Sequence, residues 1–217
     1  MSTDAVQTPR PSGGQESRSD QSKEVARIAA FSDGVFAIAI TLLALQLTVP
    51  ATGDLGQHLR ELWPSILAFV ISFLVIGSFW VNHHRLFAVV ERYDRRLVWL
   101  NLLVLFFIVA MPFTTSLIAE HGDDALAVAV YALSIAAAGL STTGLVAYAL
   151  VGHRLSSATV PTAVIRFSVV RSLVTPLVFL ASLLLLPLGP AFVTYSWLAI
   201  PVIMQIVRWR LANPGEV

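Results

Sequence analysis

The sequence predicts an all-α polytopic membrane protein with six transmembrane helices and no re-entrant pore loop. Three observations indicate this fold class. Of the 217 residues, 56% are hydrophobic and only 12% are charged, about half the charged fraction of an average soluble domain. The charged residues collect near the two ends of the chain and in short connectors. Between them lie uncharged runs of about 20 residues, each long enough as a helix to cross a hydrocarbon core of ~30 Å.

Proline and polar residues mark the limits of the six predicted spans. Pro50 ends the first span, Pro187 and Pro190 break the chain before the sixth, and Pro112 is expected to kink the third. A charged connector is predicted over residues 83–96. The spans are expected over residues 25–49, 62–82, 97–119, 125–151, 162–186 and 191–207.

The chain divides into a membrane unit and two tails. Residues 1–25 are hydrophilic and rich in Ser, Gln, Gly and Pro, so they cannot bury enough apolar surface to fold alone. We expect a disordered cytosolic N-terminal tail there, a six-helix unit over residues 26–210, and a cytosolic C-terminal tail over residues 211–217.

Lysine and arginine are placed asymmetrically between the two sides of the predicted bundle. With both termini inside, thirteen of the fourteen basic residues are cytoplasmic and only Arg60 lies outside. Cytoplasmic connectors of membrane proteins carry such an excess. We therefore predict a multi-pass plasma-membrane protein with both termini in the cytoplasm. Membrane topology accounts for the basic residues, so they do not indicate binding of nucleic acid. The sequence contains no cysteine, which excludes disulfides and thiolate metal sites.

The first span carries charged residues close to its start. Arg27 is followed six residues later by Asp33, which puts the two about 9 Å apart along the helix axis. Charges inside a bilayer are costly unless they are paired or hydrated, so they are usually kept for a function. Between them stand Phe31 and Ser32, and Val-Phe-Ala-Ile and Thr-Leu-Leu follow.

This stretch resembles the signature helix of the TMEM175 family of potassium channels. The shared pattern is Arg-x-x-x-Phe-Ser-Asp with Val-Phe-Ala-Ile and Thr-Leu-Leu, here at Arg27, residues 31–33, 35–38 and 41–43. A second copy is lacking, because Arg166-Phe167-Ser168 has neither the spacing nor the aspartate. The resemblance implies a bacterial, single-unit member in which four subunits surround one pore, a closed cyclic assembly.

One face of the first span is the candidate pore lining. Ile38, Thr41, Leu42 and Leu45 are spaced by three and four residues and so share a helix face. Four copies would stack apolar rings at Ile38, Leu42 and Leu45, which can gate by dewetting. The resemblance implies that Ile38 forms the narrowest constriction and that Thr41 is tied to selectivity.

A plainer interpretation of this face stays open. Apolar stripes in transmembrane helices often pack against neighbours or face lipid, and an intramembrane threonine often bonds to its own helix backbone. The chain has no Thr-Val-Gly-Tyr-Gly sequence, which excludes a conventional potassium filter.

Polar residues from three spans are expected to meet at the cytoplasmic side of the bundle. The family pattern also has a Trp, paired histidines and an Asn at the corresponding places. We predict an interhelical hydrogen-bond network that holds the first span against its own bundle. Its expected members are Arg27, Ser32, Asp33, Trp80, His83, His84 and Asn101.

The sequence leaves two other roles for the histidines open. His83 or His84 could sense pH, because histidine titrates near neutrality. A resident metal ion is disfavoured, since adjacent histidines on a helix point about 100° apart and no further ligand stands at the spacing that metal sites need.

The predicted function is that of a potassium-selective, leak-type cation channel. The expected partners are three further copies of the chain, the lipid bilayer and the permeant potassium ion, with no cofactor and no metal site. The alternative is a secondary ion transporter, with proton coupling as one form. Transporters commonly show internal repeats, and none is detectable here. Enzyme motifs such as Gly-x-Ser-x-Gly or His-Glu-x-x-His are absent from the spans.

Overall fold

The computed structural model describes residues 13–48, 54–200, 203 and 205, with side chains from residue 19 onward. Within these residues the chain forms helices and no strand apart from an isolated bridge between Val90 and Ser156. The helices are α1 (Gly13–Ala44), α2 (Leu55–Glu61), α3 (Trp63–Phe87), α4 (Arg95–Glu120), α5 (Ala125–Leu150), α6 (Thr162–Ser182) and α7 (Pro190–Ser196), with short 3₁₀ turns at Val151–His153, Leu183–Leu188 and Trp197–Ala199.

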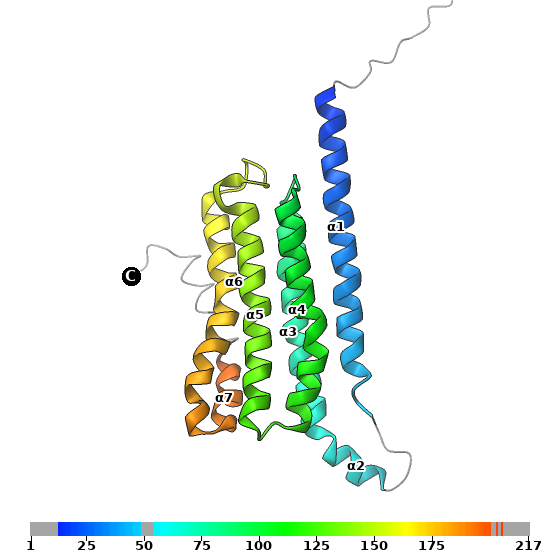
Figure 1. Ribbon diagram of the computed structural model, residues 1–217, viewed down its shortest axis with the longest axis vertical. Coiled ribbons are helices and arrows are strands. Elements are labelled where there is room, and N and C mark those ends of the chain that lie inside the picture. The colour runs from blue at the N-terminus through cyan, green and yellow to red at the C-terminus, as the bar shows by residue number, and fades with distance from the viewer. Residues whose placement is uncertain (1–12, 49–53, 201–202, 204, 206–217) are drawn as a thin grey trace, which may run out of the picture.

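The long helices stand side by side, with α1 and α6 on opposite sides of the bundle (Figure 1). α1 packs against α3 and α4, and α5 packs against both α4 and α6. We call the end with the α3–α4 and α5–α6 connections the basic end, because Arg85, Arg95 and Arg166 lie near it. The opposite end, with the turn at residues 120–124, is the acidic end.

Five helices are long and apolar enough to cross a membrane, which confirms the predicted fold class. They comprise Ser19–Ala44, Trp63–Phe87, Arg95–Glu120, Ala125–His153 and Thr162–Leu188. The sixth predicted span begins as α7 at Pro190 and continues through the 3₁₀ turn to Ala199. Its remaining residues lie largely outside the described part of the chain, as do residues 1–12, Pro50 and the predicted C-terminal tail.

The expectation of a disordered tail up to residue 25 was wrong for residues 13–25, which belong to α1. Ion pairs one turn apart, Asp20 with Lys23 at 3.6 Å and Glu24 with Arg27 at 2.7 Å, support this polar segment. Such pairs stabilise helices slightly, and a helix that already exists is extended at little cost compared with nucleation. The polar composition therefore did not prevent helix formation.

The predicted connector at residues 83–96 is also shorter than expected. α3 continues to Phe87, so His83, His84 and Arg85 are helical, and α4 begins directly after its N-cap, Asp94. The Asp94 carboxylate accepts hydrogen bonds from the Leu97 amide at 2.8 Å and from the Tyr148 hydroxyl of α5. This polar contact thus joins the start of α4 to the end of α5.

α5 is the most enclosed of the long helices. Half of its most apolar window is buried inside the bundle, and Ile135, Ala138 and Leu145 are fully buried. At Gly139 the helix passes so close to α6 that an added Cβ would lie 2.7 Å from the Pro176 ring. The core of the molecule therefore lies along α4, α5 and α6, and α1 attaches to its side.

Candidate functional site on α1

The membrane-crossing part of α1 has two different faces. Ser32, Phe36, Ala39 and Leu43 are buried, at intervals of three and four residues. The other face exposes the predicted gate and signature residues: Phe31 is 58% exposed, Ile38 61%, Leu42 40% and Leu45 73%, and Thr41 is also exposed. Residues so spaced share one side of a helix. The predicted pore-lining residues therefore point away from α3 and α4.

A chain of three hydrogen bonds fixes the buried face of α1. The Asn101 amide of α4 donates to Ser32 Oγ at 2.9 Å, and Ser32 in turn donates to the Ile28 carbonyl at 2.9 Å. On the other side, Asn101 Oδ1 lies 2.8 Å from His83 Nε2 of α3. All three side chains are at most 2% exposed. Asn101 thus links α1, α3 and α4 at one buried point.

The partners determine which nitrogen of His83 carries the proton. An amide carbonyl oxygen only accepts hydrogen bonds, so Nε2 of His83 must donate to Asn101. The ring stacks on Phe87 with centroids 4.5 Å apart and touches Phe36 at 5.4 Å. Among the described residues, the buried Nδ1 atom has no hydrogen-bond partner. His83 is thus a packed side chain with one directional contact.

Asp33 makes a separate contact closer to the surface. Trp80 Nε1 of α3 donates to Asp33 Oδ1 at 2.8 Å. The indole of Trp80 lies 5.6 Å from the ring of His84. The partner of Asp33 is therefore a neutral indole N–H. This hydrogen bond helps to fix the rotation of α1 relative to α3.

Two members of the predicted network lie apart from these hydrogen bonds. Arg27 pairs with Glu24 on α1 itself, and its side chain is 77% exposed. Among the described residues, the ring of His84 contacts the indole of Trp80. Both side chains point to the outside of the helix pair, since α1 and α3 bury Ser32 and His83 instead. The structure brings together Ser32, Asn101 and His83, and separately Asp33 and Trp80.

Gln46 makes a contact that the sequence analysis missed. Its side-chain Nε2 donates to the Pro112 carbonyl of α4 at 2.6 Å, just after α1 ends at Ala44. The sequence signal for this contact was a single amide side chain within the apolar run Leu42–Leu47, which needs a hydrogen-bond partner there. α1 is therefore tied to α4 at two polar points, near Ser32 and near Gln46, with Ile38 and Thr41 between them.

Thr41 bonds within its own helix. Its hydroxyl donates to the Ile38 carbonyl at 2.9 Å, as the plainer interpretation of an intramembrane threonine expects. A hydroxyl oxygen that donates still has lone pairs to offer as an acceptor. Because Thr41 is exposed, these lone pairs face the outer side of α1.

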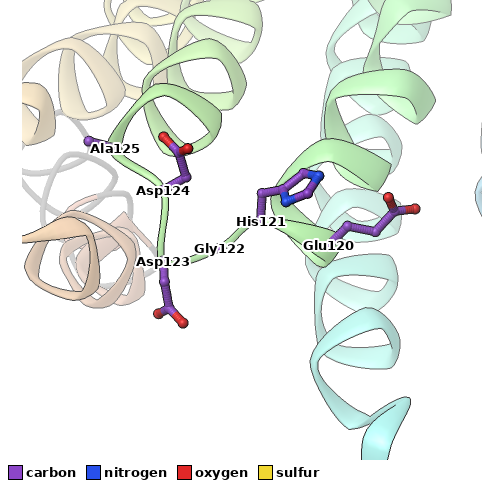
Figure 2. A pocket seen from close by; sticks show the side chains of 6 residues that line it. All are labelled: Glu120, His121, Gly122, Asp123, Asp124 and Ala125. Carbon is purple, nitrogen blue, oxygen red and sulfur yellow. The ribbon is translucent and has the colours of Figure 1, made fainter.

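The acidic turn at the other end of the bundle does not form a convergent site. Figure 2 shows the carboxylates of Glu120, Asp123 and Asp124 pointing in different directions around the turn. The Asp124 carboxylate is engaged as the N-cap of α5, accepting from the Leu126 amide at 2.7 Å. In the described part of the chain, no group of three or more His, Asp or Glu side chains is close enough to hold a metal ion.

Comparison with known proteins identifies relatives over the same helices. The family described as "Endosomal/lysosomal potassium channel TMEM175" matches residues 27–112, which run from the start of the signature to Pro112 in α4. A potassium channel of Streptomyces collinus is 53% identical over 117 residues, and one of Chamaesiphon minutus is 48% identical over 120 residues. These alignments cover 51% and 52% of this chain and 57% and 59% of the relatives, so the chain matches little more than half of their length.

A solved structure matches over a longer range. It is the crystal structure of a lysosomal potassium-selective channel TMEM175 homolog from Chamaesiphon minutus, with a TM-score of 0.71 and 34% sequence identity. The match covers 87% of this chain and 98% of that one. The fold similarity therefore extends well beyond the segment of strongest sequence similarity.

Proposed function

Because the chain belongs to the TMEM175 family, we propose that it is a potassium-selective, leak-type cation channel whose pore is lined by α1 from four identical subunits. The observation that carries this proposal is the division of α1 into two faces. Hydrogen bonds to α3 and α4 hold one face, and Ile38, Thr41, Leu42 and Leu45 lie together on the other. A helix so arranged can present a fixed surface to a central axis.

The chemistry of this face suits a narrow, weakly hydrated passage. Four copies of Ile38, Leu42 and Leu45 would make apolar rings, which resist hydrated ions by dewetting. The ring of Thr41 hydroxyls between them would offer oxygen atoms to an ion that has lost part of its water. Potassium holds its water less tightly than sodium does, so partial dehydration favours potassium.

The proposed placement in the cell follows from the two ends of the bundle. Arg85, Arg92, Arg95 and Arg96 gather at the basic end, and the excess of Lys and Arg marks the cytoplasmic side. With this end in the cytoplasm, the start of α1 lies on the cytoplasmic side, and we propose the same side for both termini. Because the similar potassium channels of Streptomyces collinus and Chamaesiphon minutus come from bacteria, we propose the plasma membrane of a bacterium.

The first test replaces the proposed constriction. Ile38→Asn puts a hydrogen-bonding side chain into the apolar ring, so we expect the potassium flux from loaded proteoliposomes to rise at least severalfold, with poorer discrimination against sodium. The control is Leu74→Asn, because Leu74 is as exposed as Ile38 but lies on α3. Unchanged flux in Ile38→Asn, or an equal rise in the control, would contradict the assignment of Ile38. Saturable, proton-coupled uptake by the unmodified protein would contradict the channel itself.

The second test separates selectivity from conductance. Thr41→Ala removes the exposed hydroxyl, so we expect the reversal potential under opposed potassium and sodium gradients to move toward zero while total current changes little. Thr143→Ala is the matched control, because the Thr143 hydroxyl donates to the Gly139 carbonyl of its own helix inside α5. An unaltered reversal potential in Thr41→Ala would remove this residue from the selectivity mechanism.

A further inference from the structure

A cavity at the basic end of the bundle lies outside the α1 site. It has a volume of about 350 Å³ and opens between the end of α3, the end of α5 and the first half of α6. Cavities of ~300–1,000 Å³ are typical of small-molecule sites. Its lining combines two arginines and an amide with an apolar wall: Asn82, Arg85, Val146, Val164, Phe167 and Arg171 represent the three helices.

The helical spacing of the lining residues shows that complete helix faces form this cavity. Asn82, Arg85, Leu86 and Val89 recur at intervals of three and four residues in α3 and its C-terminal turn. Val164, Phe167 and Arg171 do the same in α6. Residues at these intervals share a face, so one face of α3 and one face of α6 line the cavity.

The charge of the lining is positive. Arg85 and Arg171 line the cavity, and no acidic residue does so among the described residues. Arg85 is exposed in the last turn of α3, and within the described part of the chain no carboxylate forms an ion pair with it. Arginine binds phosphate with two parallel hydrogen bonds. The polar part of the cavity is therefore suited to a phosphate group.

The position of the cavity favours a ligand from the bilayer. It lies on α6 and the adjoining parts of α3 and α5, and α6 is on the opposite side of the bundle from α1 (Figure 1). Arg85 stands near the end of the membrane-crossing helix α3, at the depth of the lipid headgroups. The apolar wall formed by Val146, Val164 and Phe167 lies in the last turns of α5 and the first turns of α6, and Arg171 stands about one turn further along α6.

We propose that this cavity binds an anionic phospholipid, with the phosphate at Arg85 and an acyl chain along the apolar wall. Basic pockets between transmembrane helices on the cytoplasmic side are known to bind such headgroups. The proposal depends on the membrane-spanning fold and does not require that the protein conduct potassium. Lipid binding and ion flux can therefore fail independently of each other.

The test is a lipid titration of the purified full-length protein in detergent, read by native mass spectrometry. Phosphatidylglycerol is compared with phosphatidylcholine of the same acyl chains. We expect tighter binding of phosphatidylglycerol, and Arg85→Gln should lower that affinity about fivefold, the effect of one basic residue on an anionic lipid. Arg85→Lys should retain most of the preference. Arg166→Gln is the control, since Arg166 is exposed near the same end of α6 but outside this cavity.

A second pair of variants tests the acyl-chain part. Val164→Trp fills the cavity and should reduce binding of both lipids, whereas Val170→Trp changes the same residue type on α6 outside it. Equal affinity of wild type and Arg85→Gln for phosphatidylglycerol, or an equal loss in Arg166→Gln, would overturn the proposal. So would dissociation of the oligomer in Val164→Trp with unchanged lipid affinity, because the cavity would then be an interface between subunits.

Discussion

α1 and α5 are both long transmembrane helices, but they are held in the bundle in different ways. In α1 22% of the most apolar window is buried, compared with 50% in α5. α1 packs on one side only, against α3 and α4, whereas α5 lies between α4 and α6. Neighbouring helices therefore cover α5 on two sides, whereas one face of α1 stays uncovered.

The polar side chains of the two helices are also placed differently along each helix. Ser32 and Asp33 of α1 contact Asn101 and Trp80 on other helices, and Gln46, just after α1, contacts Pro112 of α4. In the second half of α5, Ser141, Thr142 and Thr143 donate only to carbonyls of their own helix. α5 bonds to its neighbours nearer its two ends, through Tyr131 to Ser72 and Ser134 to Thr114 at the acidic end and through Tyr148 to Asp94 at the basic end.

This comparison teaches how a helix can be fixed while one face stays exposed. Hydrogen bonds are directional and act at a point, so two or three of them set the rotation of α1 without covering it. Close packing of small residues also fixes one transmembrane helix against another, but it covers the packed face, as at Gly139 between α5 and α6. A pore-lining helix has to be held by a few hydrogen bonds of this kind, because one of its faces must stay uncovered.

The largest effect is expected where α5 meets α6. In Gly139→Val the added side chain would collide with the Pro176 ring, which lies 2.7 Å from the position of a Cβ. Overpacking of this kind costs about 1–3 kcal/mol of stability, and a rigid ring puts this site at the upper end. The thermal unfolding midpoint in detergent should fall clearly. Gly144→Val is the control, with no atom within 4 Å, and an equal fall there would contradict the role of close packing.

A smaller but more localised effect is expected on α1. Asn101→Leu removes the shared partner of Ser32 and His83 and leaves two buried polar groups without it, which costs about 1–3 kcal/mol. Amide hydrogen exchange should accelerate in α1 and stay slow in the middle of α5. Thr142→Val serves as control, since the Thr142 hydroxyl bonds only to the Ala138 carbonyl of α5. Uniform acceleration over both helices would show that Asn101 supports the whole bundle.

The smallest effect concerns the polar contact between the start of α4 and the end of α5 at the basic end. Partial burial raises the pKa of the Asp94 carboxyl, but hydrogen bonds from Tyr148 and from the Leu97 amide lower it, and the net pKa is below its ordinary value of 3.8. A carboxyl with a lowered pKa in the folded state stabilises it above the unfolded pKa. This stabilisation is lost as the pH falls through the lower, folded value.

The corresponding measurement compares wild type with Tyr148→Phe across pH. Wild type should be the more stable protein at pH 6, and the difference in unfolding midpoint should shrink below about pH 4, as Asp94 becomes protonated in both proteins. A difference that persists unchanged at pH 3 would show that Tyr148 acts through packing, for example under Arg154, whose guanidinium lies 4.8 Å above its ring.

The division of α1 into faces was predictable from the sequence, since Ile38, Thr41 and Leu45 follow the helical period. The meeting of Ser32, His83 and Asn101 was also predictable, because alternating spans bring these positions to one side of the membrane. The partner of Arg27 was not predictable, because a long, exposed side chain can pair with a neighbour on its own helix, here Glu24. Gln46 and the cavity at Arg85 depend on how α4 and α6 are rotated, and no sequence period specifies that rotation between helices.

The length of α1 has a mechanical consequence. One uninterrupted helix of 32 residues joins the polar segment beyond the bundle to Ala44, about 48 Å of stiff rod. Gln21 on this rod accepts a hydrogen bond from the Tyr93 amide, close to the head of α4. The protruding part is therefore joined stiffly to the contacts at Ser32 and Asp33 and to Ile38 and Thr41 beyond them, because the described helix has no break between them.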